Sequence, residues 1–255
     1  MSLSIQSKAG VHHTLHIYNT VDEVLGNLAE FIVKQAADAI AVNDRFSIVL
    51  SGGSSPKKLY ELLSAAPWKN RIEWDKVFFF FGDERNVPQD DPESNYLMAR
   101  TALFDPLEID SSRIFAIDTA LVPEKAALQY SKDIAGFFGK NEWHFDLVLL
   151  GLGDDAHTAS LFPGTTVLKE KEATVKSVFL PEKQVFRLTM TAPLLNQARQ
   201  IAFLVYGDSK AEAVAHIMED EPDTEKYPAQ LIAPAEGKVC WYTDKKATTR
   251  LKTQK

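Results

Sequence analysis

An aspartate and a histidine two residues apart could carry acid–base chemistry in this chain. Asp155 and His157 follow the strand-like residues 145–150, so both lie in the loop at the carboxyl end of a predicted strand. A carboxylate beside a histidine holds the ring in one tautomer and supports its charged form, which suits the ring to act as a general base near neutral pH. The alternative is a histidine that only forms hydrogen bonds within its own loop.

A pair of glycines offers a place for an anion. Gly52 and Gly53 lie between a predicted buried strand, residues 46–50, and a predicted helix whose N-cap we assign to Ser55 and whose first turn contains Pro56. Glycines there let backbone N–H groups approach an anion, and the dipole of the helix favours negative charge. The alternative is a tight turn that binds nothing. No Gly-Lys-Ser/Thr closes the turn, which excludes a P-loop.

Two basic residues also lie where predicted strands end. Arg85 follows the buried strand predicted over residues 77–81, and Lys210 lies in the first turn of a helix predicted to begin at Asp208. A cation in that turn opposes the helix dipole, so an anion bound between Lys210 and the helix amides would account for it. The alternatives are a solvated Lys210 and, for Arg85, a salt bridge to one of the two carboxylates before it. Basic groups and glycine turns at one sheet edge predict a small phosphorylated ligand.

Two other kinds of site are disfavoured. Residues 151–156 match the dinucleotide pattern G-x-G-x-x-G/A, but two aspartates within it would face the pyrophosphate, and a Pro-Gly pair soon ends the helix that should follow. The chain also lacks an H-E-x-x-H motif and has a single cysteine, Cys240, so we expect no metal site.

These residues need a scaffold that brings the ends of several strands together. Strand-like segments alternate with helical ones, and a capping box of Thr20 and Glu23 begins the first helix. The alternation predicts an α/β fold with a doubly wound, mainly parallel sheet and helices on both faces, which binds ligands outside the carboxyl ends of its strands. The predicted strands cover residues 12–18, 46–50, 77–81, 114–117, 145–150, 175–180, 185–189, 201–206 and 239–242. Of the other predicted helices, one covers residues 96–99, and three begin near residues 55, 124 and 208.

Composition narrows the classes of protein. The 255 residues are 45% hydrophobic and 25% charged, and no linker or repeat divides them, so we expect a single domain over residues 1–255. The net charge of −7 disfavours nucleic-acid binding, and no apolar run is long enough for a membrane span. Residues 1–8 lack the apolar region of a secretory signal, and the single cysteine fits a reducing compartment, so we expect a cytoplasmic protein that is a monomer or a small homo-oligomer.

An ordered set of segments in this chain resembles the 6-phosphogluconolactonases, which belong to the superfamily of glucosamine-6-phosphate and galactosamine-6-phosphate isomerases. The resemblance implies a three-layer α/β fold and the hydrolysis of 6-phospho-D-glucono-1,5-lactone to 6-phosphogluconate in the oxidative pentose phosphate pathway, without a metal or organic cofactor. The segments that carry it are residues 50–56, 82–88, 94–96, 157–164, 187–196 and 207–210.

The resemblance also implies a role for each candidate residue. His157 would be the base that activates water toward the lactone carbonyl, and Asp155 would support it. The substrate's phosphate would be held by Arg85 and Lys210, with Arg187 a weaker candidate for the same anion site. The remaining two candidates, Gly52 and Gly53, would line the sugar-phosphate pocket.

One residue departs from the family pattern. The family usually has Asp-Gly-His where this chain has alanine at position 156, between Asp155 and His157. Because alanine is disfavoured where φ is positive, we expect a negative φ at Ala156, with a tolerated strain as the alternative, and a small loss of stability in Ala156→Gly.

Two other functions stay open. One is an aldose–ketose isomerase or deaminase acting on an amino-sugar phosphate, although such deaminases typically carry an Asn-Glu pair before Pro-Gly that is missing after His157. The other is a non-catalytic sugar-phosphate sensor, which the presence of both Asp155 and His157 disfavours.

Overall fold

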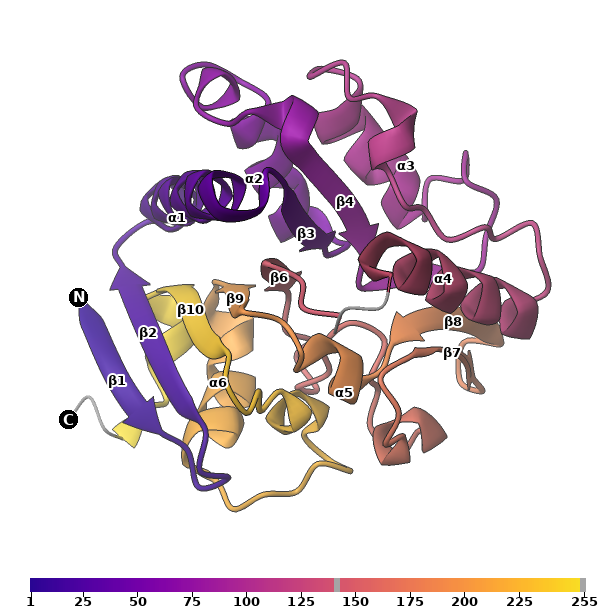
Figure 1. The fold of residues 1–255 in the computed structure, drawn as a ribbon. Coiled ribbons are helices and arrows are strands. Elements are labelled where there is room, and N and C mark those ends of the chain that lie inside the picture. The colour runs from indigo at the N-terminus through magenta and orange to yellow at the C-terminus, as the bar shows by residue number, and fades with distance from the viewer. Residues whose placement is uncertain (140–142, 253–255) are drawn as a thin grey trace.

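A seven-stranded sheet runs through the centre of the protein (Figure 1). The computed structural model describes residues 1–139 and 143–252. Within them the strand order is β1-β2-β10-β9-β6-β3-β4, and every neighbouring pair is parallel except the antiparallel β1 and β2. The strands are β1 (Ser2–Gln6), β2 (His12–Tyr18), β3 (Phe46–Leu50), β4 (Val77–Phe81), β6 (Leu147–Leu150), β9 (Gln200–Val205) and β10 (Lys238–Asp244).

Helices cover both faces of this sheet and give three layers. Ile48 and Leu50 of β3 pack with α1 (Val21–Asn43), α2 (Ser54–Leu63) and α3 (Asn95–Ala99). Between them, Val49 faces the opposite way, into a core shared with α4 (Pro123–Phe138), α5 (Ala192–Leu195) and α6 (Ala211–Glu219). This alternation follows from the two-residue period of a strand. The predicted α/β fold with helices on both faces is confirmed.

Local signals in the sequence set several of these elements. The Thr20 side chain accepts the N–H of Glu23, whose carboxylate accepts the N–H of Thr20 in return, so the predicted capping box begins α1. The aromatic run of β4 is buried almost throughout, as predicted, with the rings of Phe79 and Phe80 in opposite cores. The N-cap of α2, however, is Gly53 rather than Ser55, because Ser54 already begins the helix.

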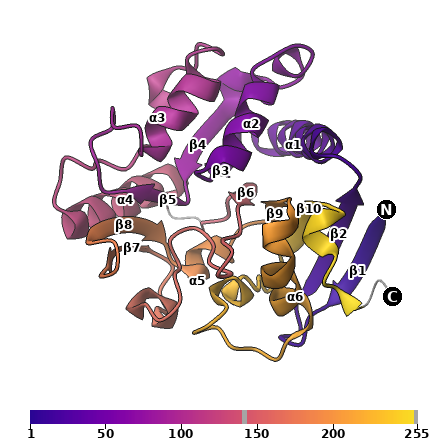
Figure 2. The same cartoon turned by 180° about the vertical axis from the view of Figure 1, so that it is seen from behind.

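A second sheet is the main departure from the predicted architecture. Residues Val175–Leu180 and Val185–Met190 form β7 and β8, which pair with the short β5 (Asp83–Arg85) in an antiparallel sheet ordered β5-β8-β7. A connection of only four residues joins β7 to β8, and strands joined so closely pair antiparallel. Seen from behind, this sheet lies beside the β4 end of the large sheet, far from β1 (Figure 2). The strand predicted over residues 114–117 is wrong, since one bridge between Ile114 and Phe79 replaces it.

The order of the strands fixes where a ligand can bind. From β3 the chain next adds β4 on one side, whereas β6, β9 and β10 extend the sheet on the other. The loops after β3 and β6 therefore leave the sheet in opposite directions, and the crevice between them is the usual binding place in such a sheet. Among the described helices, none combines the length and the apolar character needed to cross a membrane.

Candidate active site

A pocket of about 300 Å³ opens at the carboxyl ends of β3, β4, β6 and β9. Five of the seven predicted site residues line it: Gly52, Gly53, Arg85, His157 and Lys210. The other two, Asp155 and Arg187, lie beside His157 and Arg85. Segments far apart in the sequence are therefore brought to one place, as the fold requires.

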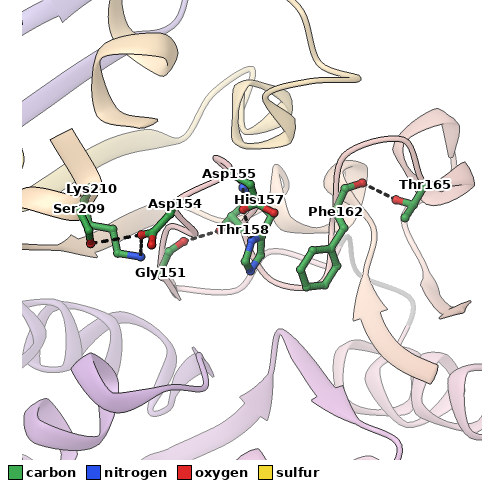
Figure 3. Close-up of polar contacts among 9 residues, drawn as sticks. All are labelled: Gly151, Asp154, Asp155, His157, Thr158, Phe162, Thr165, Ser209 and Lys210. Carbon is green, nitrogen blue, oxygen red and sulfur yellow. Dashed lines mark hydrogen bonds and ion pairs between the residues drawn. The ribbon is translucent and has the colours of Figure 1, made fainter. Parts of the chain in front are cut away.

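Asp155 forms a hydrogen bond with the imidazole ring of His157 (Figure 3). Oδ1 of Asp155 lies 2.5 Å from Nδ1 of His157 and also accepts the backbone N–H of His157 at 3.2 Å. Because a carboxylate oxygen only accepts, the proton between them belongs to Nδ1, and Nε2 is the nitrogen that can take a proton. The imidazole stacks on Phe162 with ring centres 4.2 Å apart, and its side chain is 29% exposed.

The pairing changes the pKa of Asp155. Partial burial acts to raise it, but the hydrogen bond from the His157 side chain, its charge and its backbone N–H outweigh burial, so the pKa of Asp155 lies below its ordinary value. Asp155 is therefore a carboxylate at neutral pH and stabilises a positive charge on His157.

The loop that carries this pair has a tightly specified backbone. A Cβ at Gly153 would overlap the His157 ring and the Asp155 carboxylate, so glycine there leaves room for both. Ala156 has φ +61°, not the negative value we expected, and Ala159 has φ +47°. The buried methyl group of Ala156 packs in the core, and its carbonyl accepts the N–H of Ala229 at 3.0 Å. These contacts hold alanine in a conformation that costs an L-residue about 1–2 kcal/mol.

Two arginines face each other on the other side of the pocket. Arg85 and Arg187 are direct partners in the antiparallel register of β5 and β8. The Arg85 guanidinium donates to the backbone carbonyl of Glu93, so the alternative of a salt bridge to a preceding carboxylate gives way to this contact. Burial, and then the charge of Arg85, lower the pKa of Arg187. Like charges directly opposite in a sheet are destabilising, and an anion between them would remove that cost.

Lys210 completes the positive side of the pocket. It ends the 3₁₀ turn Asp208–Lys210, and α6 follows from Ala211, so the α-helix begins three residues later than predicted. Its ammonium nitrogen lies 2.7 Å from Oδ1 of Asp154, and its side chain is 27% exposed. Lys210 therefore reaches the pocket from the end of β9 with a carboxylate beside it.

The glycine pair is needed for two different reasons. A Cβ at Gly52 would overlap the side chain of Asn95, which packs against it, whereas Gly53 has φ +103°. As N-cap of α2, Gly53 offers no side chain to the first-turn N–H groups, and Ser54 and Ser55 of that turn line the pocket. This helix N-terminus suits an anion.

Several residues around the pocket make contacts that the sequence did not predict. The carboxylate of Asp83 lines the pocket and accepts the hydroxyl of Ser160 at 2.6 Å, which ties β5 to the His157 loop. The buried Glu84 accepts the backbone N–H groups of Asn95 and Tyr96 at the start of α3. All of them lie within the segments that carried the family resemblance, but spacing alone gave no sign of these contacts.

A metal ion in a protein needs several ligand side chains close together. In residues 1–139 and 143–252, no three side chains of the types His, Cys, Asp and Glu converge so that they could hold a metal ion. The expectation of a reaction without metal stays a prediction.

Comparisons with known proteins agree with this fold and pocket. A family model described as glucosamine-6-phosphate isomerases/6-phosphogluconolactonase matches residues 19–241. A 6-phosphogluconolactonase of Synechocystis is 41% identical over 87% of this chain and 91% of its own length, and one of Bos taurus is 36% identical over 93% of each. The structure of a 6-phosphogluconolactonase from Trypanosoma brucei, 32% identical, superposes with a TM-score of 0.82 over 93% of this chain and 98% of that one. The chain belongs to the glucosamine-6-phosphate isomerase/6-phosphogluconolactonase family.

Proposed function

We propose that this chain hydrolyses 6-phospho-D-glucono-1,5-lactone to 6-phosphogluconate. The relatives described above carry the name of that activity. The observation that carries the proposal in this chain is a pocket with two unlike sides, a His–Asp pair on one and a cluster of cations on the other. A phosphorylated lactone has the matching two ends, a carbonyl that water can attack and a phosphate.

His157 acts as the general base. Nε2 takes a proton from water as the water oxygen bonds to the lactone carbonyl carbon, and Asp155 stabilises the resulting imidazolium. The tetrahedral intermediate then collapses, the ring C–O bond breaks, and the proton on Nε2 goes to the departing ring oxygen. The products are a hydroxyl group and a carboxylic acid, which ionises, so His157 returns to its starting state.

The cations hold the phosphate. Arg85 and Lys210 line the pocket, and Arg187 lies opposite Arg85 across β5 and β8, so the phosphate can neutralise groups that repel one another in its absence. Gly52 and Gly53 line the same pocket, where a side chain would collide with Asn95 or require a strained backbone. The sugar ring lies against these glycines, with its phosphate on the cations and its carbonyl carbon toward His157.

The decisive experiment is a lactone-hydrolysis assay with freshly generated phospholactone. The rate of acid release, corrected for spontaneous hydrolysis, should be saturable and should exceed that for unphosphorylated gluconolactone. Release of ammonia from glucosamine 6-phosphate under the same conditions would favour a deaminase. Tight binding of sugar phosphates without turnover of either compound would favour a sensor.

A further inference from the structure

Asp154 lies beside the pocket without lining it, and it connects the loop of His157 to Lys210. It directly precedes the Asp155–His157 pair, but its side chain extends toward Lys210 (Figure 3). Its Oδ1 lies 2.7 Å from the Lys210 ammonium nitrogen and accepts the hydroxyl of Ser209 at 3.3 Å. The cation that would hold the substrate's phosphate thus already has a carboxylate partner.

This ion pair is easy to exchange. The side chain of Asp154 is 67% exposed, and exposed pairs contribute little because water and salt screen them. A phosphate dianion carries more charge than the carboxylate and can accept from Arg85 and Lys210 together, so it can take the place of Asp154. A neutral or singly charged ligand interacts more weakly with Lys210 and competes less well.

We propose that Asp154 is a specificity-determining residue whose carboxylate competes with the ligand's phosphate for Lys210. Only a ligand with a doubly charged group displaces this carboxylate efficiently. Asp154 therefore selects against ligands that carry less negative charge. The proposal rests on the proposed function, since it concerns the phosphate of the same substrate.

The first test is Asp154→Asn, measured by calorimetric titration of the full chain with inorganic phosphate at pH 8. Without the competing charge, the phosphate Kd should fall about three- to tenfold, the range set by an exposed ion pair and a nearby like charge. Asp154→Ser, whose side chain is too short to replace the contact, should give the same gain. A Kd that is unchanged or higher in both variants would show that Asp154 merely positions Lys210 and would overturn the proposal.

The controls separate competition from a general change in charge. Asp208→Asn removes the same charge from the turn that carries Lys210 and should change the Kd less than twofold. In a Lys210→Met background, the gain from Asp154→Asn should also fall below twofold. An equal gain at Asp208, or a gain that persists without Lys210, would contradict competition for this lysine.

Salt gives a further check. Raising the ionic strength to about 1 M shortens the screening length to about 3 Å, so the advantage of Asp154→Asn should shrink. An advantage that is independent of salt would argue against an electrostatic cause. Phosphate titration does not depend on turnover, so a chain that shows this gain but does not hydrolyse the lactone would overturn the proposed function and leave the role of Asp154 intact.

Discussion

The two sides of the pocket are built in different ways. On the acid–base side, Asp155 and His157 come from one loop and lie 2.5 Å apart, with Gly153 leaving the space that both need. On the cationic side, Arg85 comes from β5, Arg187 from β8 and Lys210 from the turn before α6. One side is local in the sequence, whereas the other exists only because distant segments meet.

The two sides also differ in how their charges are satisfied. His157 and Asp155 are partners, so the acid–base side is complete without a ligand. Arg85 and Arg187 face each other, and Lys210 is paired with an exposed carboxylate. In the proposed function, the acid–base side is therefore preorganised for chemistry, and the cationic side gains stability when an anion binds.

The largest effect should come from removing the base on the acid–base side. His157→Asn should lower kcat by about 10²–10⁴-fold, the usual contribution of a positioned acid–base group, and leave the phosphate Kd almost unchanged. Steady-state kinetics, corrected for spontaneous hydrolysis, measures the first and calorimetry the second.

A second histidine supplies a matched control. His216 is held in the same manner, 2.5 Å from Asp220 and stacked on Tyr227 at 4.2 Å, but it lies in α6 outside the pocket. His216→Asn should leave kcat within twofold. A His157 variant with more than a tenth of the original kcat would assign the base to another residue.

The next largest effect is a loss of folding stability in acid, which sets a lower pH limit for any measurement on the pocket. Burial, and then the charge of His12, lower the pKa of His13 to about 4, and Nδ1 of His13 accepts the indole N–H of Trp241. Between the unfolded pKa of about 6.5 and the folded value, the unfolded chain binds a proton that the native chain does not. The free energy of unfolding should therefore fall by up to about 3 kcal/mol as the pH drops through that window.

Urea denaturation at pH 7 and pH 4.5 measures this loss. His13→Gln, which keeps an acceptor for Trp241, should show a much smaller loss between the two pH values. His12→Gln, at an exposed position, removes only the lesser cause of the lowered pKa of His13 and should keep most of the loss. Equal losses in all three proteins would assign the acid sensitivity to other groups.

Truncating the cationic side should weaken substrate binding. Charge-assisted hydrogen bonds contribute about 1.5–3 kcal/mol each, so Arg85→Ala and Lys210→Ala should raise the KM for the phosphorylated lactone about ten- to a hundredfold. The KM for unphosphorylated gluconolactone should hardly change. The matched control is Arg199→Ala, because Arg199 directly precedes β9 and so lies at the end of that strand opposite the pocket. Equal losses on both lactones would make these two residues structural and remove the distinction between the two sides.

A smaller effect tests the strain in the His157 loop. Glycine at position 156 would relieve the strain of the positive φ, which stabilises the fold. It would also remove a buried methyl group worth about 0.8 kcal/mol and give the unfolded chain more conformational freedom, and both of these changes destabilise the fold. These contributions nearly cancel, so Ala156→Gly should change the free energy of unfolding by less than about 1 kcal/mol.

Ala202 in β9 provides the comparison for Ala156. It is fully buried on an ordinary strand, so Ala202→Gly has the same losses without the relief and should be less stable than Ala156→Gly by about 1–2 kcal/mol. Denaturant unfolding of the two variants measures the difference. Equal destabilisation would mean that Ala156 is not strained. A large gain in kcat for Ala156→Gly would show that alanine misdirects His157.

The last prediction is that removal of metal ions has no effect on the rate. If His157 and the cations suffice, exhaustive treatment with EDTA should leave the rate of lactone hydrolysis within experimental error. A loss that one divalent ion restores would place a metal in the reaction and would contradict the division of work between the two sides.

The sequence by itself determined the acid–base side and most of the scaffold. Asp155 and His157 need only a two-residue spacing to meet, and the capping box at Thr20 and Glu23 is equally local. The apolar runs of β3 and β4 marked strands buried on both faces, and the strand–helix alternation marked the sheet edge where the pocket opens. Such features depend on residues that are near one another in the sequence, so the amino-acid sequence alone is enough to predict them.

The tertiary structure alone decided the rest. It paired Arg85 with Arg187, tied Asp83 to Ser160, and held Ala156 at positive φ by burying its methyl group and bonding its carbonyl to Ala229. Strand register depends on which faces of β5, β7 and β8 are buried by the whole fold, and a one-residue shift would turn every side chain to the opposite face. Local spacing holds no information on that choice, because the energy that decides it comes from contacts between distant segments.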